Sequence, residues 1–209
     1  HALPVEVDGS IDKESLLAAI KPDDIHMPLS RLLCLENTVS GRIQSKTNLD
    51  SLNRVARENG LKTHLDGARL MNAVISTGIS AADYSVEFDS VSLCISKGLG
   101  APVGSVLVGD ESFIKTGRRL RKMLGGGMRQ AGVIAAACDY ALSNNIERLV
   151  QDHQRAFELA RRLVDIEFAH VSVNEVETNM VFLQLPKFLS LGLRAFLADR
   201  DIIISPPTR

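Results

Sequence analysis

Residues 90–104 read Ser90-Val-Ser-Leu-Cys-Ile-Ser-Lys-Gly-Leu-Gly-Ala-Pro-Val-Gly104, an apolar, β-prone run that ends at Lys97 and passes at once into a glycine-rich turn. A lysine at the end of a buried strand is costly to place, because its charge must be desolvated or neutralised. One chemistry uses such a lysine: the amine loses its proton and forms a Schiff base with an aldehyde. The alternative is a lysine that extends from the strand end to water. Spacing alone favours this alternative, because isolated short motifs often arise by coincidence.

A second run, Leu61-Lys-Thr-His-Leu-Asp-Gly-Ala-Arg69, indicates a short strand that passes into a helix at Gly67. Asp66 then stands at the carboxyl end of its strand, where ligands bind in open α/β sheets. A carboxylate there can pair with a protonated pyridine nitrogen, or it can cap the following helix, and the two roles are compatible. Arg69 is expected on the same face of the first helical turn. Its guanidinium is placed either to hold a substrate carboxylate or to form a surface ion pair.

The apolar periodicity alternates between the helical and the extended period along the chain. It predicts helices at 12–20, 48–59, 67–76, 110–123 and 132–142, and strands at 31–36, 61–65, 91–96 and 105–108. This alternation predicts an α/β fold with a mostly parallel sheet covered by helices, formed by residues 1–145. Residues 146–209 are expected to form a smaller α+β C-terminal domain. Its predicted elements are a helix at 146–164, strands near 171 and at 180–185, a helix at 189–199 and a strand at 202–204.

Charge and cysteine content restrict the class of protein. With 24 basic against 25 acidic residues, net charge indicates neither a nucleic-acid nor a membrane partner. The one dense basic run, residues 118–122, fits a solvated helix face or anion recognition equally well. Cys34, Cys94 and Cys138 are widely spaced and odd in number, which argues against a disulfide framework or a zinc site. Without a visible signal peptide or a membrane-length apolar stretch, we expect a reducing, cytoplasmic compartment.

Four motifs occur in the order in which one known family has them. They are Leu35-Glu-Asn-Thr38, His64-Leu-Asp-Gly-Ala-Arg69, Ser96-Lys-Gly-Leu-Gly-Ala-Pro-Val-Gly104 and Arg121-Lys-Met-Leu-Gly-Gly-Gly-Met-Arg-Gln130. Together they resemble the low-specificity L-threonine aldolases, pyridoxal-phosphate-dependent lyases of the aspartate-aminotransferase superfold (fold type I). The resemblance is highly specific over residues 22–142 and looser to the end of the chain. It implies retro-aldol cleavage of threonine and allo-threonine to glycine and acetaldehyde.

The resemblance implies a cofactor, pyridoxal 5'-phosphate, and residues of this chain that hold it. Lys97 is implied to carry the cofactor as a Schiff base and to act in catalysis, and Asp66 to keep the ring nitrogen protonated. Lys122 and Arg129 flank three glycines whose backbone amides can approach an anion closely. They are implied to contact the cofactor phosphate or a neighbouring subunit. No bound metal is expected.

Substrate contacts are implied in the same way. Arg69 and Arg209 are implied to bind the carboxylate of a β-hydroxy amino acid, which turns the Cα–Cβ bond into position for cleavage. His26 is implied to lie near the β-substituent, as an acid, a base or a specificity residue. The chain departs from the usual pattern at Val39-Ser40, where relatives often have His-Asn. This difference concerns the stereochemical preference at the β-carbon more than the class of reaction.

Several alternatives remain open. The family carries an upstream Gly-Thr phosphate-binding turn and a stacking histidine, which are not recognisable here, so we expect a segment upstream of His1. The function is then either that of the aldolase, of another fold type I enzyme such as a β-lyase or a cysteine desulfurase, or of a catalytically silent remnant. Superfold relatives form active sites between two subunits, so a homodimer or homotetramer is expected. A nucleotide-binding module lacks its fingerprint, because the glycines at 98, 100 and 104 do not have G-x-G-x-x-G spacing.

Overall fold

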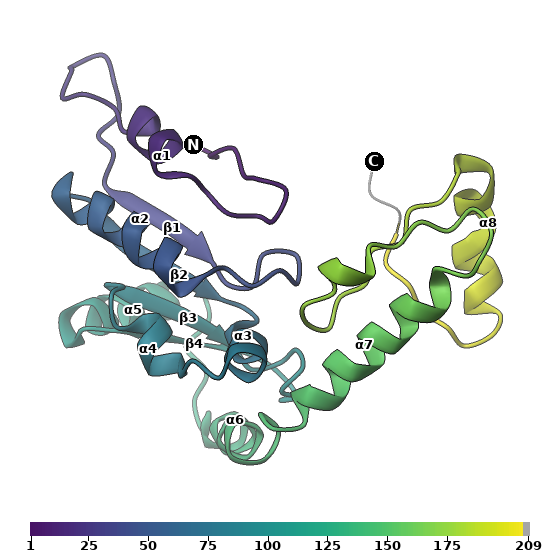
Figure 1. Ribbon diagram of the computed structural model, residues 1–209. Helices are drawn as coiled ribbons and strands as arrows, with labels where there is room; N and C mark the ends of the chain where they lie inside the picture. Colours follow the sequence, from purple (N-terminus) through teal and green to yellow (C-terminus); the bar gives the residue numbers. More distant parts are fainter. Residues whose placement is uncertain (207–209) are drawn as a thin grey trace.

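The computed structural model of the chain describes residues 1–206, and Figure 1 shows how its elements follow one another. The elements are, in chain order, α1 (Lys13–Ala19), β1 (Leu32–Glu36), α2 (Lys46–Glu58), β2 (Lys62–Gly67), α3 (Leu70–Thr77), α4 (Ala81–Ser85), β3 (Ser90–Cys94), β4 (Ser105–Gly109), α5 (Glu111–Met123), α6 (Gly132–Asn144), α7 (Leu149–Leu163), the 3-10 turn η1 (Val173–Glu175) and α8 (Lys187–Ala198). The strands form one sheet in the N-terminal part of the chain. α7 leads away from this sheet to α8 (Figure 1).

The sheet has the order β1-β2-β3-β4, with β1, β2 and β3 parallel and β4 antiparallel to β3. This confirms the mostly parallel sheet that the sequence predicts. Strand direction follows from the length of each connection. α2 separates β1 from β2, and α3 with α4 separates β2 from β3, so each crossover is long enough to return the chain for a parallel strand. Only residues 95–104 join β3 to β4, which is too short for such a crossover, and β4 turns back.

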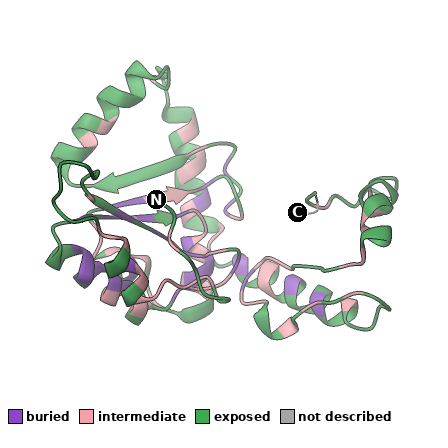
Figure 2. Cartoon of the chain, turned by 90° about the horizontal axis from the view of Figure 1, so that it is seen from above, coloured by how far each residue is buried: buried purple, intermediate pink, exposed green. Residues whose placement is uncertain are grey.

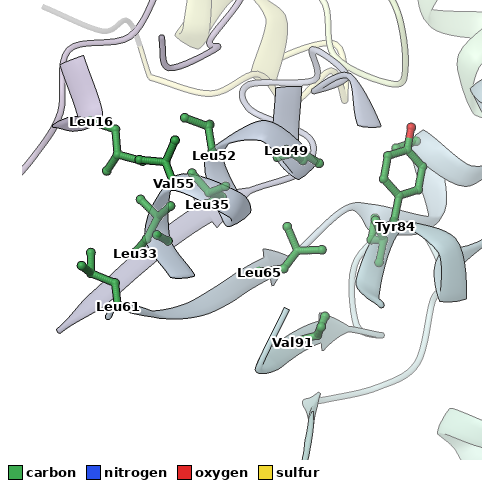
Figure 3. Packing of buried hydrophobic residues seen from close by; sticks show 13 residues of the cluster. Leu16, Leu33, Leu35, Leu49, Leu52, Val55, Leu61, Leu65, Tyr84 and Val91 are labelled. Carbon is green, nitrogen blue, oxygen red and sulfur yellow. The ribbon is translucent and has the colours of Figure 1, made fainter. Parts of the chain in front are cut away.

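The main hydrophobic core lies between the sheet and α2, as Figure 3 shows. Leu33 and Leu35 of β1 are buried in it, whereas Cys34 between them is exposed on the opposite face. This is the period-two alternation of a strand that is covered on one side. The same alternation buries Leu65 of β2 and leaves Asp66 exposed. The face opposite the main core is therefore the more polar one.

The end of α2 fixes where β2 begins. Gly60 has a left-handed φ of +72°, the conformation in which a glycine commonly ends a helix. Its N–H donates to the Arg57 carbonyl oxygen at 3.0 Å, and the Leu61 N–H donates to the Ala56 carbonyl oxygen at 2.9 Å. These two bonds satisfy the last carbonyl groups of the helix and turn the chain directly into β2.

A second, smaller core joins the turn after β3 to the following helices. Ile95 and Leu99 are buried against Ala141 of α6 and Leu149 of α7. Leu149 also explains why residue 98 is a glycine, because a Cβ at that position would lie 2.8 Å from the Leu149 Cδ2. The turn between Ile95 and Leu99 is thus fixed by packing on both sides.

The C-terminal part contains less β-structure than the sequence predicts. The strands expected near 171 and at 180–185 are reduced to one isolated bridge between His170 and Gln184, and residues 202–204 are not in a strand. An isolated pair of short strands without a covered face is not stable by itself, and this part of the chain is largely exposed (Figure 2). The two predicted helices are present as α7 and α8.

Three further properties hold for residues 1–206. No helix in this range combines the length and the apolar character needed to cross a lipid bilayer. Cys34, Cys94 and Cys138 are free thiols. No group of three or more His, Cys, Asp or Glu side chains in the described part of the chain is arranged to hold a metal ion.

Candidate active site at the carboxyl edge of the sheet

The ends of the parallel strands bring Glu36, Asp66 and Lys97 to one edge of the sheet. Glu36 is the last residue of β1 and is paired in register with Asp66 of β2, which is paired with Ser92 of β3. Side chains paired in register point to the same face of a sheet, here the face opposite the main core. Lys97 follows three residues after Cys94, where β3 ends. The two motifs singled out in the sequence therefore meet at this edge.

Asp66 is held by its own turn. Its Oδ1 accepts a hydrogen bond from the Ala68 backbone N–H at 2.9 Å. Gly67 between them is tightly packed, because a Cβ there would lie 2.7 Å from the Ser92 carbonyl oxygen. The other oxygen, Oδ2, has no partner among residues 1–206, and the side chain is exposed. The carboxylate is thus fixed at one oxygen and open at the other.

The helix after Asp66 begins later than the sequence predicts. α3 starts at Leu70 and not at Gly67, with Arg69 as its N-cap residue and no side-chain cap. Asp66 therefore caps the turn at Ala68 and not the helix, and it does not share a helical face with Arg69. The reason is that pairing with β3 extends β2 as far as Gly67, so the strand continues for two residues beyond its predicted end.

Lys97 lies in a turn whose backbone is closed by hydrogen bonds. The Ile95 N–H donates to the Gly104 carbonyl oxygen at 3.1 Å, and the Gly100 N–H donates to the Lys97 carbonyl oxygen at 2.9 Å. The Lys97 side chain is exposed and has no hydrogen bond or ion pair within the described residues. The burial expected for a strand-end lysine is absent from this chain, because Lys97 follows the strand and is not part of it.

Two side chains from the junction of α6 and α7 hold this turn by its carbonyl groups. Asn145 Nδ2 donates to the Leu99 carbonyl oxygen at 2.7 Å, and Arg148 Nη2 donates to the Gly98 carbonyl oxygen at 3.0 Å. Neither residue is predicted from the sequence. Each acts across about fifty residues, and no local pattern marks an asparagine or an arginine as the partner of a distant turn.

Glu36 is a further member of the site that the sequence prediction did not include. Its pKa lies above the ordinary glutamate value, first because the side chain is half-buried and second because Asp66 is close. The positive charges of Arg69 and Lys97 act on this pKa in the opposite direction. Glu36 is therefore within electrostatic range of all three groups. The feature of the sequence that indicates Glu36 as a member of the site is its position at a strand end, level with Asp66.

Arg69 belongs to this cluster, whereas His26 does not. The Arg69 guanidinium forms no ion pair within residues 1–206, which leaves it open to a ligand carboxylate. His26 lies in the exposed loop 21–30. The Lys21 N–H donates to Ser30 Oγ at 3.0 Å and closes this loop, and the chain then enters the amino end of β1. β1 has five residues, so roughly 13 Å of strand separates that end from the carboxyl edge. No contact within the described residues joins His26 to the cluster, and its role stays a prediction.

No hydrogen bond or ion pair joins the other predicted residues to Lys97 within the described part of the chain, and their roles stay predictions. Lys122 lies in the last turn of α5 and Arg129 in the loop before α6, both exposed. α6 contacts the turn of Lys97 through Ala141, and Arg129 precedes Ala141 by 12 residues. α6 begins only at Gly132, so Arg129 lies outside the helix and before its first residue. Arg209 lies outside the described residues.

The chemistry of this edge fits one kind of ligand. An unpaired amine can bond to an aldehyde, and a carboxylate with one open oxygen can accept a hydrogen bond from a ring N–H. An unpaired guanidinium can bind a carboxylate with two hydrogen bonds. Lys97, Asp66 and Arg69 offer these three functions at one sheet edge. They fit an aromatic aldehyde cofactor with a ring nitrogen, together with a substrate that carries a carboxylate.

The fold and this edge define the class of protein: a mostly parallel α/β sheet with a lysine and an aspartate at the carboxyl ends of adjoining strands. The chain belongs to the Beta-eliminating lyase family, whose profile matches residues 1–186. It is 41% identical over 198 residues to the low specificity L-threonine aldolase of Escherichia coli K12, and 45% identical over 207 residues to low-specificity L-threonine aldolase 1 of Arabidopsis thaliana. These matches cover 95% of this chain but only 59% and 58% of the two relatives.

Solved structures agree with this assignment. A putative aromatic amino acid beta-eliminating lyase/threonine aldolase from Exiguobacterium matches 96% of the chain with a TM-score of 0.77 and 25% identity, over 55% of its own length. A putative L-allo-threonine aldolase from Listeria monocytogenes matches 88% with a TM-score of 0.71 and 24% identity, over 52% of its length. The PLP-bound C-S lyase from Staphylococcus hominis shares the fold, with a TM-score of 0.60 and 17% identity over 94% of this chain and 49% of that one.

Proposed function

We propose that the chain is part of a pyridoxal-phosphate-dependent lyase that cleaves threonine and allo-threonine to glycine and acetaldehyde. The observation that carries this proposal is the meeting of Lys97 and Asp66 at one sheet edge, each with a functional group open to a ligand. The names of the E. coli and Arabidopsis relatives support the reaction, and the PLP-bound fold neighbour supports the cofactor. Residues 1–145 would then form part of a large cofactor-binding domain, and residues 146–209 part of a smaller one.

Bound at this edge, pyridoxal phosphate supplies an electron sink for the bonds of the amino-acid Cα. Lys97 would hold the cofactor through its amine, which the fixed turn of residues 95–104 keeps near the end of β3. Asp66 would pair with the ring nitrogen through its open oxygen Oδ2, while the Ala68 N–H holds Oδ1. The rigid hold on one oxygen orients the other without a further loss of side-chain freedom.

Arg69 decides which bond is cleaved in this proposal. Its guanidinium binds the carboxylate of the substrate with two hydrogen bonds and so fixes the rotation about the substrate Cα. Fixing this rotation would select the Cα–Cβ bond for cleavage to an aldehyde and glycine, and positioning of this kind can lower a barrier by several kcal/mol. The position of Arg69 at the start of α3, three residues beyond Asp66, brings its charge within range of the same edge.

A product assay separates the candidate reactions. The chain is incubated with pyridoxal phosphate and either L-threonine, L-allo-threonine or L-cysteine, and acetaldehyde, glycine, pyruvate and alanine are measured. We expect acetaldehyde and glycine in equal amounts from both threonine isomers. Pyruvate as the main product would identify a β-lyase, and alanine from cysteine a desulfurase. A chain that binds the cofactor and yields none of these products would be the silent remnant, and the proposed reaction would be wrong.

A second copy of the chain is the partner that we propose. No residue of β4 or α5 is buried, and Leu124 and Val133 beyond them are 86% and 72% exposed. An edge strand and helices with this much exposed apolar surface favour association. A partner copy is also a reason for Lys122 and Arg129 to lie away from the cluster of their own chain. Sedimentation velocity at micromolar concentration should give a dimer or a larger species, and a strictly monomeric boundary would contradict the proposal.

A further inference from the structure

Glu36 is the one charged group of the cluster to which the proposed function gives no task. It ends β1, is paired in register with Asp66, and points to the same face. Its half-buried carboxyl group has no hydrogen bond or ion pair in the described part of the chain. A buried or half-buried charge without a partner is destabilising. A positively charged ligand at this edge would stabilise the Glu36 carboxylate beside that of Asp66.

We propose that Glu36 is a positioning residue that acts through Asp66: its carboxylate adds a second negative charge beside Asp66 and strengthens the hold of this edge on a protonated ring nitrogen. This inference rests on the proposed function, because the ring is that of pyridoxal phosphate. Asp66 remains the group that touches the ring. Glu36 lies one strand farther from Lys97, so the strand order places Asp66 between them.

The electrostatics of the edge support this role. Burial and the charge of Asp66 both raise the pKa of Glu36, while Arg69 and Lys97 lower it. The charged groups near Glu36 are thus Asp66 of β2, Arg69 in the turn before α3 and Lys97 in the turn after β3. Its own strand adds the Cys34 thiol. A cation bound at Asp66 would favour ionised Glu36 in the same way as Arg69 and Lys97 do.

The sign of the pH dependence follows from this coupling. Ionised Glu36 attracts the ring cation and neutral Glu36 does not, so cofactor affinity should rise as the pH rises through the Glu36 titration. Conversely, binding of the cofactor should lower the pKa of Glu36 and release a proton, because linkage is reciprocal. One charge at a distance of several ångströms in a partly buried site changes affinity by about tenfold.

The first test needs no cofactor. Carboxyl carbons of glutamate are labelled with carbon-13, and the Glu36 resonance, assigned by its loss in Glu36→Gln, is titrated in the whole chain. We expect a midpoint above the ordinary glutamate range, which falls toward that range in Asp66→Asn because the neighbouring charge is gone. An unchanged midpoint in Asp66→Asn would show that the two groups are not coupled, and the inference would be wrong.

The second test measures the dissociation constant of pyridoxal phosphate across pH by absorption titration. Glu36→Gln keeps the size of the side chain and removes its charge, and we expect about tenfold weaker binding and loss of the pH step. Glu36→Asp keeps the charge and should stay within about threefold of the wild type. A purely structural role predicts the opposite order, since glutamine preserves the packing and aspartate does not. Glu58→Gln, exposed at the last position of α2, is the control and should bind like the wild type.

The outcomes separate this inference from the proposed function. If the wild-type chain does not bind pyridoxal phosphate through Lys97, the proposed function is wrong, and the role of Glu36 falls with it. If the wild type binds and Glu36→Gln binds equally well with the same pH profile, only the role of Glu36 is wrong. Weaker binding by Glu36→Gln together with rescue by Glu36→Asp supports both.

Discussion

Lys97→Ala is expected to abolish the visible absorption band of lysine-bound pyridoxal phosphate and to lower the rate of threonine cleavage on the order of 10³-fold. The physical reason is that a Schiff base with an aldehyde requires an amine, and Lys97 is the lysine that the described residues bring to this edge. It is exposed and unpaired within residues 1–206, so no competing ion pair has to break. The measurement is an absorption spectrum after cofactor addition, together with the acetaldehyde assay.

The control for this variant is Lys13→Ala. Lys13 is an exposed lysine at the first position of α1, remote in sequence from both site motifs. It should leave the band and the rate unchanged. Because Lys97 lies in a turn fixed by backbone bonds and by Asn145, the Lys97→Ala chain should retain its circular dichroism spectrum. A Lys97→Ala chain that keeps the band and the rate would contradict the assignment of the site.

Asp66→Asn is the second substitution with a large expected effect. The amide keeps the shape of the side chain, and its oxygen can still accept from the Ala68 N–H, so the turn should persist. The negative charge that holds the ring-nitrogen proton is lost, and with it the electron-withdrawing power of the ring. We expect the rate of threonine cleavage to fall on the order of 10²-fold, while the bond through Lys97 still forms.

The measurement for Asp66→Asn combines the acetaldehyde assay with the absorption spectrum across pH. Asp23→Asn, an exposed aspartate in the loop before β1, provides a matched change of charge and should behave like the wild type. Full activity of Asp66→Asn would show that Asp66 serves only its turn. Loss of the folded circular dichroism spectrum is not expected, since the side chain is exposed and its hydrogen bond is conserved by the amide.

The sheet and the two principal residues could be predicted because local patterns determine them. The alternation of Leu33, Cys34 and Leu35 is a property of a strand covered on one face. Long helical connections make neighbouring strands parallel. Parallel strands have their carboxyl ends at the same edge of the sheet, so polar residues at those ends come together there. The approach of Asp66 and Lys97 therefore needs no knowledge of distant contacts.

Other parts of the site depend on contacts that no local pattern encodes. The start of α3 at Leu70 is set by the pairing of β2 with β3, which outweighs the helical preference of the preceding residues. The turn at Lys97 is held by Asn145 and Arg148 from far along the chain. His26 was placed by resemblance alone, and the loop that carries it joins the opposite end of β1. The apolar periodicity predicts the C-terminal strands, but a strand also requires a partner, and the described residues of this part form only the bridge between His170 and Gln184.

The central claim is that one lysine, Lys97, bonds to the aldehyde of pyridoxal phosphate beside Asp66. The most direct measurement is reduction of the wild-type chain with borohydride in the presence of the cofactor, followed by mass spectrometry of its peptides. The account predicts one stable phosphopyridoxyl group per chain, located on the peptide that contains Lys97. A label found mainly on another lysine, or spread over many lysines in proportion to their exposure, would contradict it.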